Sequence, residues 1–292
     1  MNGVDLLAGA TAPAAVGVVG GGRMGVGIAH AFLLAGARVQ ILERDDRAAA
    51  HAEQALASAV RQSVTRGTTE RGEAELLADS AVTIDITALA DANLVVEAVP
   101  EDLALKTDML QRIEAVLAPS AWLTSNTSSL SITLLAAPLR RPERFLGLHF
   151  FNPVPSSTLV EIVQGERTSE AAVDAARNWV HMIGKNPIVV QDFPGFASSR
   201  LGVVIALEAI RMLEDGVATA ADIDTAMVQG YKFPVGPLRL TDMVGLDVRL
   251  GIAEYLHGTL GERFAPPPLL IEMVAAGKLG RKSGEGFFSW PD

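Results

Sequence analysis

The sequence predicts an α/β protein, with an open parallel sheet in its N-terminal part and an all-helical C-terminal part. From Ala15 to about Asp192, short apolar runs alternate with segments whose apolar residues recur every three or four positions. This alternation indicates parallel strand–helix–strand units, because parallel strands need a crossover connection, usually a helix. The expected strands are Val16 to Val19, Val39 to Leu42, Leu94 to Val96, Trp122 to Thr124, Phe145 to Phe150, Leu159 to Val163 and Ile188 to Val190.

The helical part begins where this pattern breaks. The strand signal stops at Asp192-Phe193-Pro194-Gly195, because proline and glycine end the last strand before a helix starts. We expect a flexible tail over residues 1–14, a sheet domain over 15–194 and a helical domain over 195–292. The expected helices of the second domain are Arg200 to Leu213, Ala220 to Val228, Leu246 to Leu256 and Leu269 to Ala275.

Composition excludes several classes of protein. Apolar residues make up 49% of the 292 residues and charged residues 20%, which predicts a folded protein throughout. The net charge of -10 disfavours nucleic acid as a partner, because a phosphate backbone attracts clustered basic residues. No apolar stretch reaches the roughly 18 residues that indicate a membrane span, and the first 14 residues lack the basic start of a signal peptide. Without cysteine there are no disulfides or thiolate-bound zinc, so we expect a cytosolic protein with no metal site.

A glycine-rich motif follows the first expected strand. Gly20, Gly22 and Gly25 form G-x-G-x-x-G between this strand and an apolar helix. The first glycine permits a tight turn, the second lets the backbone approach a pyrophosphate, and the third lets helix and strand pack closely. The motif predicts a Rossmann-type dinucleotide-binding domain, with a glycine-rich turn that binds nothing as the alternative.

Cofactor choice depends on Glu43, which ends the second expected strand 23 residues after Gly20. A carboxylate there can accept hydrogen bonds from both ribose hydroxyls of NAD and repels the 2′-phosphate of NADP. The adjacent Arg44 argues against this preference for NAD. Glu43 could also be a solvated strand end. We expect NAD as the cofactor.

His149 is the one histidine of five that falls at the end of an apolar strand. Ligands of such sheets bind near the carboxyl ends of the strands, and a general base must lie close to them. Glu161 follows twelve residues later inside another apolar strand. Because a buried carboxylate needs a partner, the two residues could form a dyad in which Glu161 orients the imidazole. A core histidine and an outward-facing carboxylate on an edge strand are the alternatives.

Longer motifs lie further along the chain. They are Asn126-Thr127-Ser128-Ser129, the run from His149 to Pro155, Leu159-Val160-Glu161, Pro194-Gly195-Phe196, Pro234-Val235-Gly236-Pro237 with Asp242 and Gly245-Leu246-Asp247, and Gly277 to Phe288. In this order and spacing, from about Ala15 to Trp290, the chain resembles the L-3-hydroxyacyl-CoA dehydrogenase family. The resemblance implies a Rossmann domain and a helical domain that forms a homodimer.

The resemblance also implies roles for individual residues. His149 matches the family's general base, and Glu161 matches its carboxylate partner. Ser128 matches the serine that hydrogen-bonds the reacting oxygen, and Asn152 matches the asparagine beside the catalytic histidine.

Two further charged residues are assigned by the resemblance alone. Glu101 and Lys106 match the pair that contacts the nicotinamide end of NAD. Without the resemblance, they are ordinary charges near the start of a helix.

Three departures from the family concern the substrate. Ser199 replaces an asparagine of the motif Pro-Gly-Phe-x-x-Asn-Arg, and Ser157-Thr158 replaces Met-Lys before Leu-Val-Glu. The helix after the second strand offers only Arg61 and Arg66, where relatives carry several lysines near the CoA phosphates. We therefore take Ser199 and Arg66, with Ser128, as expected substrate contacts. The departures predict a roomier pocket in which short unbranched acyl-CoA substrates are poor.

Together these residues predict an NAD-dependent dehydrogenase that interconverts a 3-hydroxyacyl thioester, with CoA as the expected handle, and its 3-oxoacyl form. One alternative is the same chemistry on a carrier-protein thioester or a free hydroxy acid. The other is a catalytically silent NAD-binding protein, against which the set of His149, Glu161 and Ser128 argues.

Overall fold

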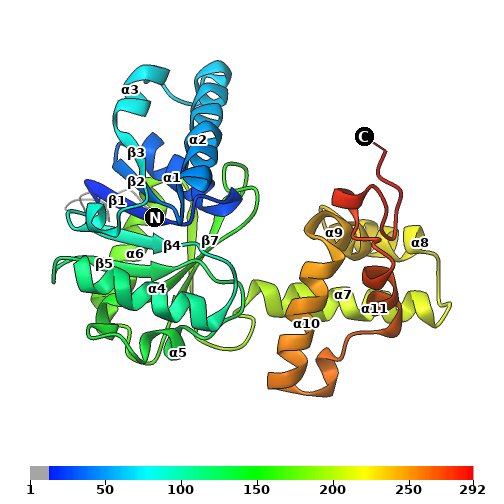
Figure 1. Ribbon diagram of the computed structural model, residues 1–292. Coiled ribbons are helices and arrows are strands. Elements are labelled where there is room, and N and C mark those ends of the chain that lie inside the picture. The colour runs from blue at the N-terminus through cyan, green and yellow to red at the C-terminus, as the bar shows by residue number, and fades with distance from the viewer. Residues whose placement is uncertain (1–12, 292) are drawn as a thin grey trace, which may run out of the picture. The chain divides into compact units, whose positions relative to one another are not determined.

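The computed structural model describes residues 13–291, which divide into two compact units at the boundary between Asp192 and Phe193 (Figure 1). Of the expected tail, only Pro13 and Ala14 belong to the described residues. Across this described range, no helix combines the length and the apolar character that crossing a membrane requires. The predicted α/β class, with a Rossmann-type sheet followed by a helical domain, is confirmed.

The first unit is built on a single eight-stranded sheet with the order β3-β2-β1-β4-β5-β6-β7-β8. Neighbouring strands are parallel except β6 and β7, so β7 and β8 run against the other six. The strands are β1 (Ala15–Val19), β2 (Arg38–Leu42), β3 (Ser80–Thr83), β4 (Leu94–Glu97), β5 (Trp122–Ser125), β6 (Phe145–Phe150), β7 (Leu159–Gln164) and β8 (Asn186–Gln191).

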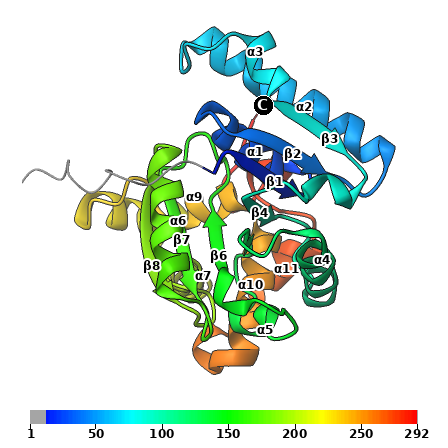
Figure 2. The ribbon, with the colours of Figure 1, turned by 90° about the vertical axis from the view of Figure 1, so that its left-hand side faces the viewer.

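Helices cover both faces of this sheet. Figure 2 shows α6 on one side and α4 with α5 on the other. Helices α1, α2 and α6 bury apolar residues in one core together with β1, β2, β4, β6 and β7. The helices are α1 (Arg23–Leu34), α2 (Asp46–Arg66), α3 (Glu73–Ala78), α4 (Leu103–Val116), α5 (Ile132–Ala136) and α6 (Glu170–Met182), with short 3-10 turns at Ile86–Leu89 and Pro142–Arg144.

Two features of the sheet differ from the expectation. The short edge strand β3 was not predicted, because Ser80-Ala81-Val82-Thr83 is only partly buried and carries no continuous apolar run. The prediction that all strands are parallel was also wrong, since β7 and β8 run in the opposite direction. Residues 151–158 alone join β6 to β7, which is too short for the dozen or more residues of a parallel crossover.

The second unit is helical, and its described residues form no strand beyond two isolated bridges near the C-terminus. The sequence missed α9, which has only eight residues and begins directly at Pro237. The expected helix from Ala220 to Val228 ends earlier as an α-helix and continues as a π-helical turn over Ala226–Gly230. The helices are α7 (Ser198–Glu214), α8 (Ala220–Thr225), α9 (Pro237–Val244), α10 (Leu246–Leu260) and α11 (Pro268–Ala275), with 3-10 turns at Glu262–Phe264 and Arg281–Ser283.

The parallel strands of the first unit bring their carboxyl ends to one edge of the sheet. The segments that follow β1, β2, β4, β5 and β6 therefore meet there. The cofactor-binding and catalytic residues predicted in the first unit belong to these segments, except His149 near the end of β6 and Glu161 within β7. This edge is the candidate active site, since ligands of open α/β sheets bind at the carboxyl ends of the strands.

Candidate active site

The turn after β1 is one that only glycine can form. Gly20 has a φ of +94°, and a Cβ there would lie 2.8 Å from the carbonyl oxygen of Ala98. At Gly25, a Cβ would lie 1.7 Å from the carbonyl oxygen of Gly20. The first glycine thus permits the turn, and the last lets α1 approach it, as the motif predicts.

Gly22 differs from these two because its surroundings are open. A Cβ on Gly22 would meet no atom of the described chain within 4 Å. Gly22 also precedes the first residue of α1, whose first backbone N–H groups have no partner within the helix. An open backbone surface at a helix start fits the pyrophosphate of a dinucleotide.

Glu43 follows β2 and holds this turn from the side. Its Oε1 accepts a hydrogen bond from the backbone N–H of Gly21 at 2.6 Å, and its Oε2 accepts one from the N–H of Arg44 at 3.0 Å. Each carboxylate oxygen can still accept a further bond, so both ribose hydroxyls could be bound. The Arg44 guanidinium pairs with Asp45 at 3.0 Å.

His149 and Glu161 form the dyad that the sequence suggested. They face each other across the antiparallel pair β6–β7, which is the register that brings side chains of two strands closest. The Nδ1 of His149 lies 2.7 Å from Oε2 of Glu161, and both side chains are buried. The ring of Phe151 packs against the imidazole with 4.6 Å between ring centroids.

This contact determines which imidazole nitrogen can act as a base. A carboxylate only accepts hydrogen bonds, so the Nδ1 of His149 carries a proton and donates it to Glu161. In the neutral imidazole, Nε2 then holds the lone pair. The arrangement orients the ring and stabilises its protonated form, which is the role of the carboxylate in a catalytic triad.

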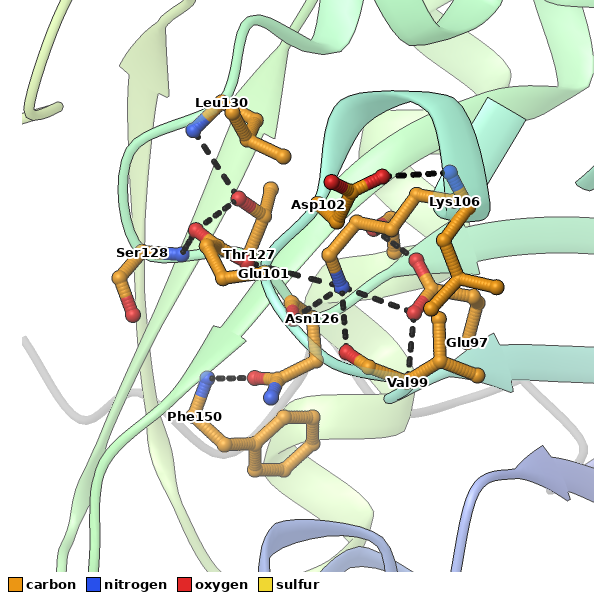
Figure 3. Close-up of polar contacts among 12 residues, drawn as sticks. Glu97, Val99, Glu101, Asp102, Lys106, Asn126, Thr127, Ser128, Leu130 and Phe150 are labelled. Carbon is orange, nitrogen blue, oxygen red and sulfur yellow. Dashed lines mark hydrogen bonds and ion pairs between the residues drawn. The ribbon is translucent and has the colours of Figure 1, made fainter. Parts of the chain in front are cut away.

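Glu101 organises the segment after β5, which contains Ser128. Its Oε1 accepts hydrogen bonds from the backbone N–H of Ser128 at 2.8 Å, from the Oγ1 of Thr127 at 2.6 Å and from the N–H of Ser129 at 3.2 Å. In Figure 3 the Ser128 hydroxyl points away from this carboxylate. Glu101 thus fixes the backbone and leaves the hydroxyl for another partner.

Lys106 is buried and surrounded by protein oxygens. Its side chain has 0% exposure, and its Nζ lies 2.8 Å from Oε1 of Glu97, 3.0 Å from the carbonyl oxygen of Val99 and 3.3 Å from that of Asn126 (Figure 3). Asp102 caps the start of α4 by accepting from the N–H of Leu105, and Lys106 follows in the first turn. The ammonium therefore binds protein oxygens, and the contact with the nicotinamide end that the resemblance implies for Lys106 stays a prediction.

Two residues of this cluster were missed from the sequence. Glu97 ends β4 with no exposed surface, and burial raises its pKa against the opposing effects of Lys106 and of hydrogen bonds from Ser125 and Val99. Asn126 accepts a hydrogen bond at its Oδ1 from the N–H of Phe150, beside His149, at 3.0 Å. The argument applied to Glu161, that a carboxylate within an apolar strand needs a partner, would also have found Glu97.

The remaining predicted site residues are Asn152, Arg66 and Ser199. Asn152 is exposed just beyond β6, and Arg66 is the exposed last residue of α2, about 30 Å along the helix from its start. A basic residue in the last turn also stabilises a helix by itself. Ser199 is buried in the first turn of α7 and belongs to the second unit.

Family models match both units of the chain. The NAD-binding domain of 3-hydroxyacyl-CoA dehydrogenase matches residues 15–193. The C-terminal domain of the same family matches residues 195–290. Together the two matches leave few residues of the chain unassigned.

Curated relatives and solved structures agree with these matches. A 3-hydroxybutyryl-CoA dehydrogenase of Mycobacterium tuberculosis is 42% identical, over 94% of this chain and 98% of that protein. The mitochondrial hydroxyacyl-coenzyme A dehydrogenase of Rattus norvegicus is 37% identical, over 94% and 90%. The crystal structure of (S)-3-hydroxybutyryl-CoA dehydrogenase from Ralstonia eutropha has a TM-score of 0.91 at 37% identity, and the match covers 96% of this chain and 100% of that one.

Proposed function

The chain belongs to the 3-hydroxyacyl-CoA dehydrogenase family, and from this premise we propose its substrate, its catalytic residues and its assembly. It is an NAD-dependent oxidoreductase that interconverts 3-hydroxyacyl-CoA and the 3-oxoacyl form. The observation that carries the proposed mechanism is the 2.7 Å contact between His149 and Glu161. The cytosolic location expected from the sequence stays a prediction.

His149 is the general base of this proposal. Its Nε2 takes the proton of the substrate hydroxyl, and Glu161 stabilises the imidazolium that forms. In the reverse direction, the same imidazolium returns the proton to the forming alkoxide. The two residues lie opposite one another on β6 and β7 with both side chains buried, so the ring keeps one orientation in both directions of the reaction.

Ser128 binds the reacting oxygen of the substrate in this proposal, and the glycine-rich turn binds the cofactor. The Ser128 hydroxyl donates to the oxygen on which charge develops, and Asn152 contributes a further polar group there. Gly20, Gly22 and Glu43 hold the dinucleotide, with Glu101 near its nicotinamide end. NAD, when bound, supplies the acceptor for the hydride.

We propose 3-hydroxybutyryl-CoA as the substrate, because the relatives that are 37 to 42% identical and cover nearly the whole chain include several of that name. This choice replaces the expectation that short acyl-CoA substrates are poor. NADH absorbance should show a kcat/KM of at least about 10⁴ M⁻¹s⁻¹ with this substrate. Free 3-hydroxybutyrate should be at least about a hundredfold worse. Equal rates for the free acid and the thioester would reject CoA as the handle.

Ser199 should still influence which acyl chain is preferred. Its short side chain is buried at the start of α7, and an asparagine there would add volume and both a donor and an acceptor. We expect Ser199→Asn to shift the ratio of kcat/KM for 3-hydroxybutyryl-CoA over 3-hydroxyoctanoyl-CoA toward the shorter chain, by at least about threefold. Both substrates are measured on one preparation, so the concentration of active enzyme cancels in the ratio. An unchanged ratio would show that this departure is neutral.

The second unit is expected to form the interface of a homodimer. The sequence of α7 is apolar on nearly every side, and Leu201 on this helix is 61% exposed. Met243 on α9 and Val248 on α10 are exposed as well. Apolar side chains left uncovered by their own domain favour association with a second copy. Light scattering at micromolar concentration should therefore give the mass of two chains.

A pair of charge substitutions tests this assembly. Leu201→Asp should shift the protein toward the monomer, because it places a charge in the proposed interface. Ile84→Asp makes the same change at an exposed apolar residue of the first unit and should leave the mass unchanged. A monomeric wild type, or a dimer unaffected by Leu201→Asp, contradicts the proposed interface.

A further inference from the structure

Glu97 is a fully buried carboxylate to which the proposed mechanism gives no role. It ends β4, and its carboxylate binds three hydrogen-bond donors. Oε1 accepts from Lys106 Nζ at 2.8 Å and from the backbone N–H of Val99 at 2.6 Å, and Oε2 accepts from the Ser125 hydroxyl at 2.5 Å. Burial raises the pKa of this carboxyl, and the three donors act in the opposite direction by favouring its charged form.

Lys106 connects this carboxylate to both catalytic segments. Its ammonium lies among oxygens of Glu97, Val99 and Asn126, and 3.6 Å from Oε2 of Glu101. Of these oxygens, only those of Glu97 and Glu101 carry charge. Glu97 is the nearer of the two and is completely buried, so it is the main counter-ion.

One connection leads to the neighbour of the catalytic histidine. The carbonyl oxygen of Asn126 accepts from Lys106 Nζ, and the backbone N–H of Asn126 donates to the Glu97 carbonyl at 2.7 Å. The Asn126 side chain accepts from the N–H of Phe150, which directly follows His149. The position of Asn126 therefore fixes the end of β6.

The other connection leads to Ser128. The Oε1 of Glu101 holds the N–H of Ser128 at 2.8 Å, while its Oε2 lies on the side of Lys106 (Figure 3). If Lys106 lost its nearer counter-ion, its ammonium would move toward Glu101, because a buried ammonium requires a negative partner. That movement would displace the carboxylate of Glu101, which accepts the hydrogen bond from the backbone N–H of Ser128.

We propose that Glu97 is a positioning residue of the hydride-transfer site, whose charge holds Lys106 where it fixes Ser128 through Glu101 and the end of β6 through Asn126. This inference rests on the proposed function of His149 and Ser128. It assigns Lys106 to the support of the site, and it assigns no ligand contact to Glu97. Small displacements of catalytic groups reduce turnover strongly, so we expect the loss of the Glu97 charge to lower kcat.

The test compares Glu97→Gln with Glu114→Gln. Glu114 is a matched control, since it is a buried carboxylate of the same helix as Lys106 and accepts backbone N–H bonds from Arg140 and Arg141, away from the site. Glu97→Gln should lower kcat at least about tenfold and change the Kd of NADH less than about threefold. Glu114→Gln should keep kcat within about twofold of the wild type. Should Glu97→Gln not fold, Ser125→Ala removes one donor to Glu97 and should lower kcat by about two- to fivefold.

Hydrogen–deuterium exchange of the free protein gives a readout independent of turnover. Glu97→Gln should speed exchange in residues 126–130 and 149–152, and Glu114→Gln should speed it in residues 137–142 instead. The proposal is overturned if residues 126–130 exchange as in the wild type, if kcat matches that of Glu114→Gln, or if NADH binding weakens as much as kcat falls. A wild type inactive on 3-hydroxybutyryl-CoA would reject the proposed substrate, and the exchange experiment would still decide the role of Glu97.

Discussion

Replacing His149 by alanine is expected to lower kcat by about 10²- to 10⁴-fold, the usual contribution of a positioned general base. The loss should come from proton transfer, since without the imidazole only water can accept the hydroxyl proton. NADH binding should change little, because the residues proposed to hold the cofactor are those of the turn after β1 and Glu43. Turnover is measured by NADH absorbance, and binding by fluorescence titration.

Two further variants separate proton transfer from packing. Glu161→Gln keeps an acceptor for Nδ1 but removes the charge that stabilises the imidazolium, so about a tenfold to hundredfold loss is expected. His30→Ala removes another buried histidine, whose Nε2 lies 3.0 Å from the Ser63 hydroxyl. It should lower the melting temperature and leave turnover within about threefold. Near-normal turnover of His149→Ala would reject the mechanism.

The cofactor turn could be predicted from the sequence because its constraints are local. A strand, three glycines at fixed spacing and a helix specify both the turn and the close approach of backbones, whatever the rest of the chain does. The acidic residue after β2 follows from the length of one strand–helix–strand unit. Glu43 accordingly lies against Gly21, although the sequence did not predict that its carboxylate would bind the backbone of the turn.

The dyad and the buried cluster depend on contacts that local patterns do not determine. His149 could be linked to Glu161 because each stands out as polar in an apolar strand, but only the antiparallel register places them opposite one another. Lys106 looks like a solvated charge in the first turn of a helix. Whether such a lysine faces solvent or the core depends on a carboxylate in another strand, here Glu97. The resemblance identified Lys106 but gave no indication of this partner.

The protein is expected to bind NAD more tightly than NADP by well over about tenfold, equivalent to more than about 1.4 kcal/mol. The reason is the placement of Glu43, whose two oxygens lie beside the turn proposed to bind the dinucleotide. A 2′-phosphate there would meet a carboxylate at close range in a half-buried setting. Calorimetric titration with each dinucleotide measures the ratio.

Glu43→Gln isolates the charge from the structure of the turn. The amide oxygen can still accept from the N–H of Gly21, so the turn should keep its shape although the bond from the N–H of Arg44 is lost, whereas alanine would remove both bonds. NADP should then bind at least about fivefold more tightly than to the wild type, and NAD at most about threefold more weakly. Asp85→Asn neutralises an exposed carboxylate just beyond the neighbouring strand and can still accept the hydrogen bond from the backbone N–H of Thr87, so the ratio should stay within about twofold. If the wild type binds both dinucleotides equally, or if Glu43→Gln leaves the ratio unchanged, Glu43 does not bind the ribose.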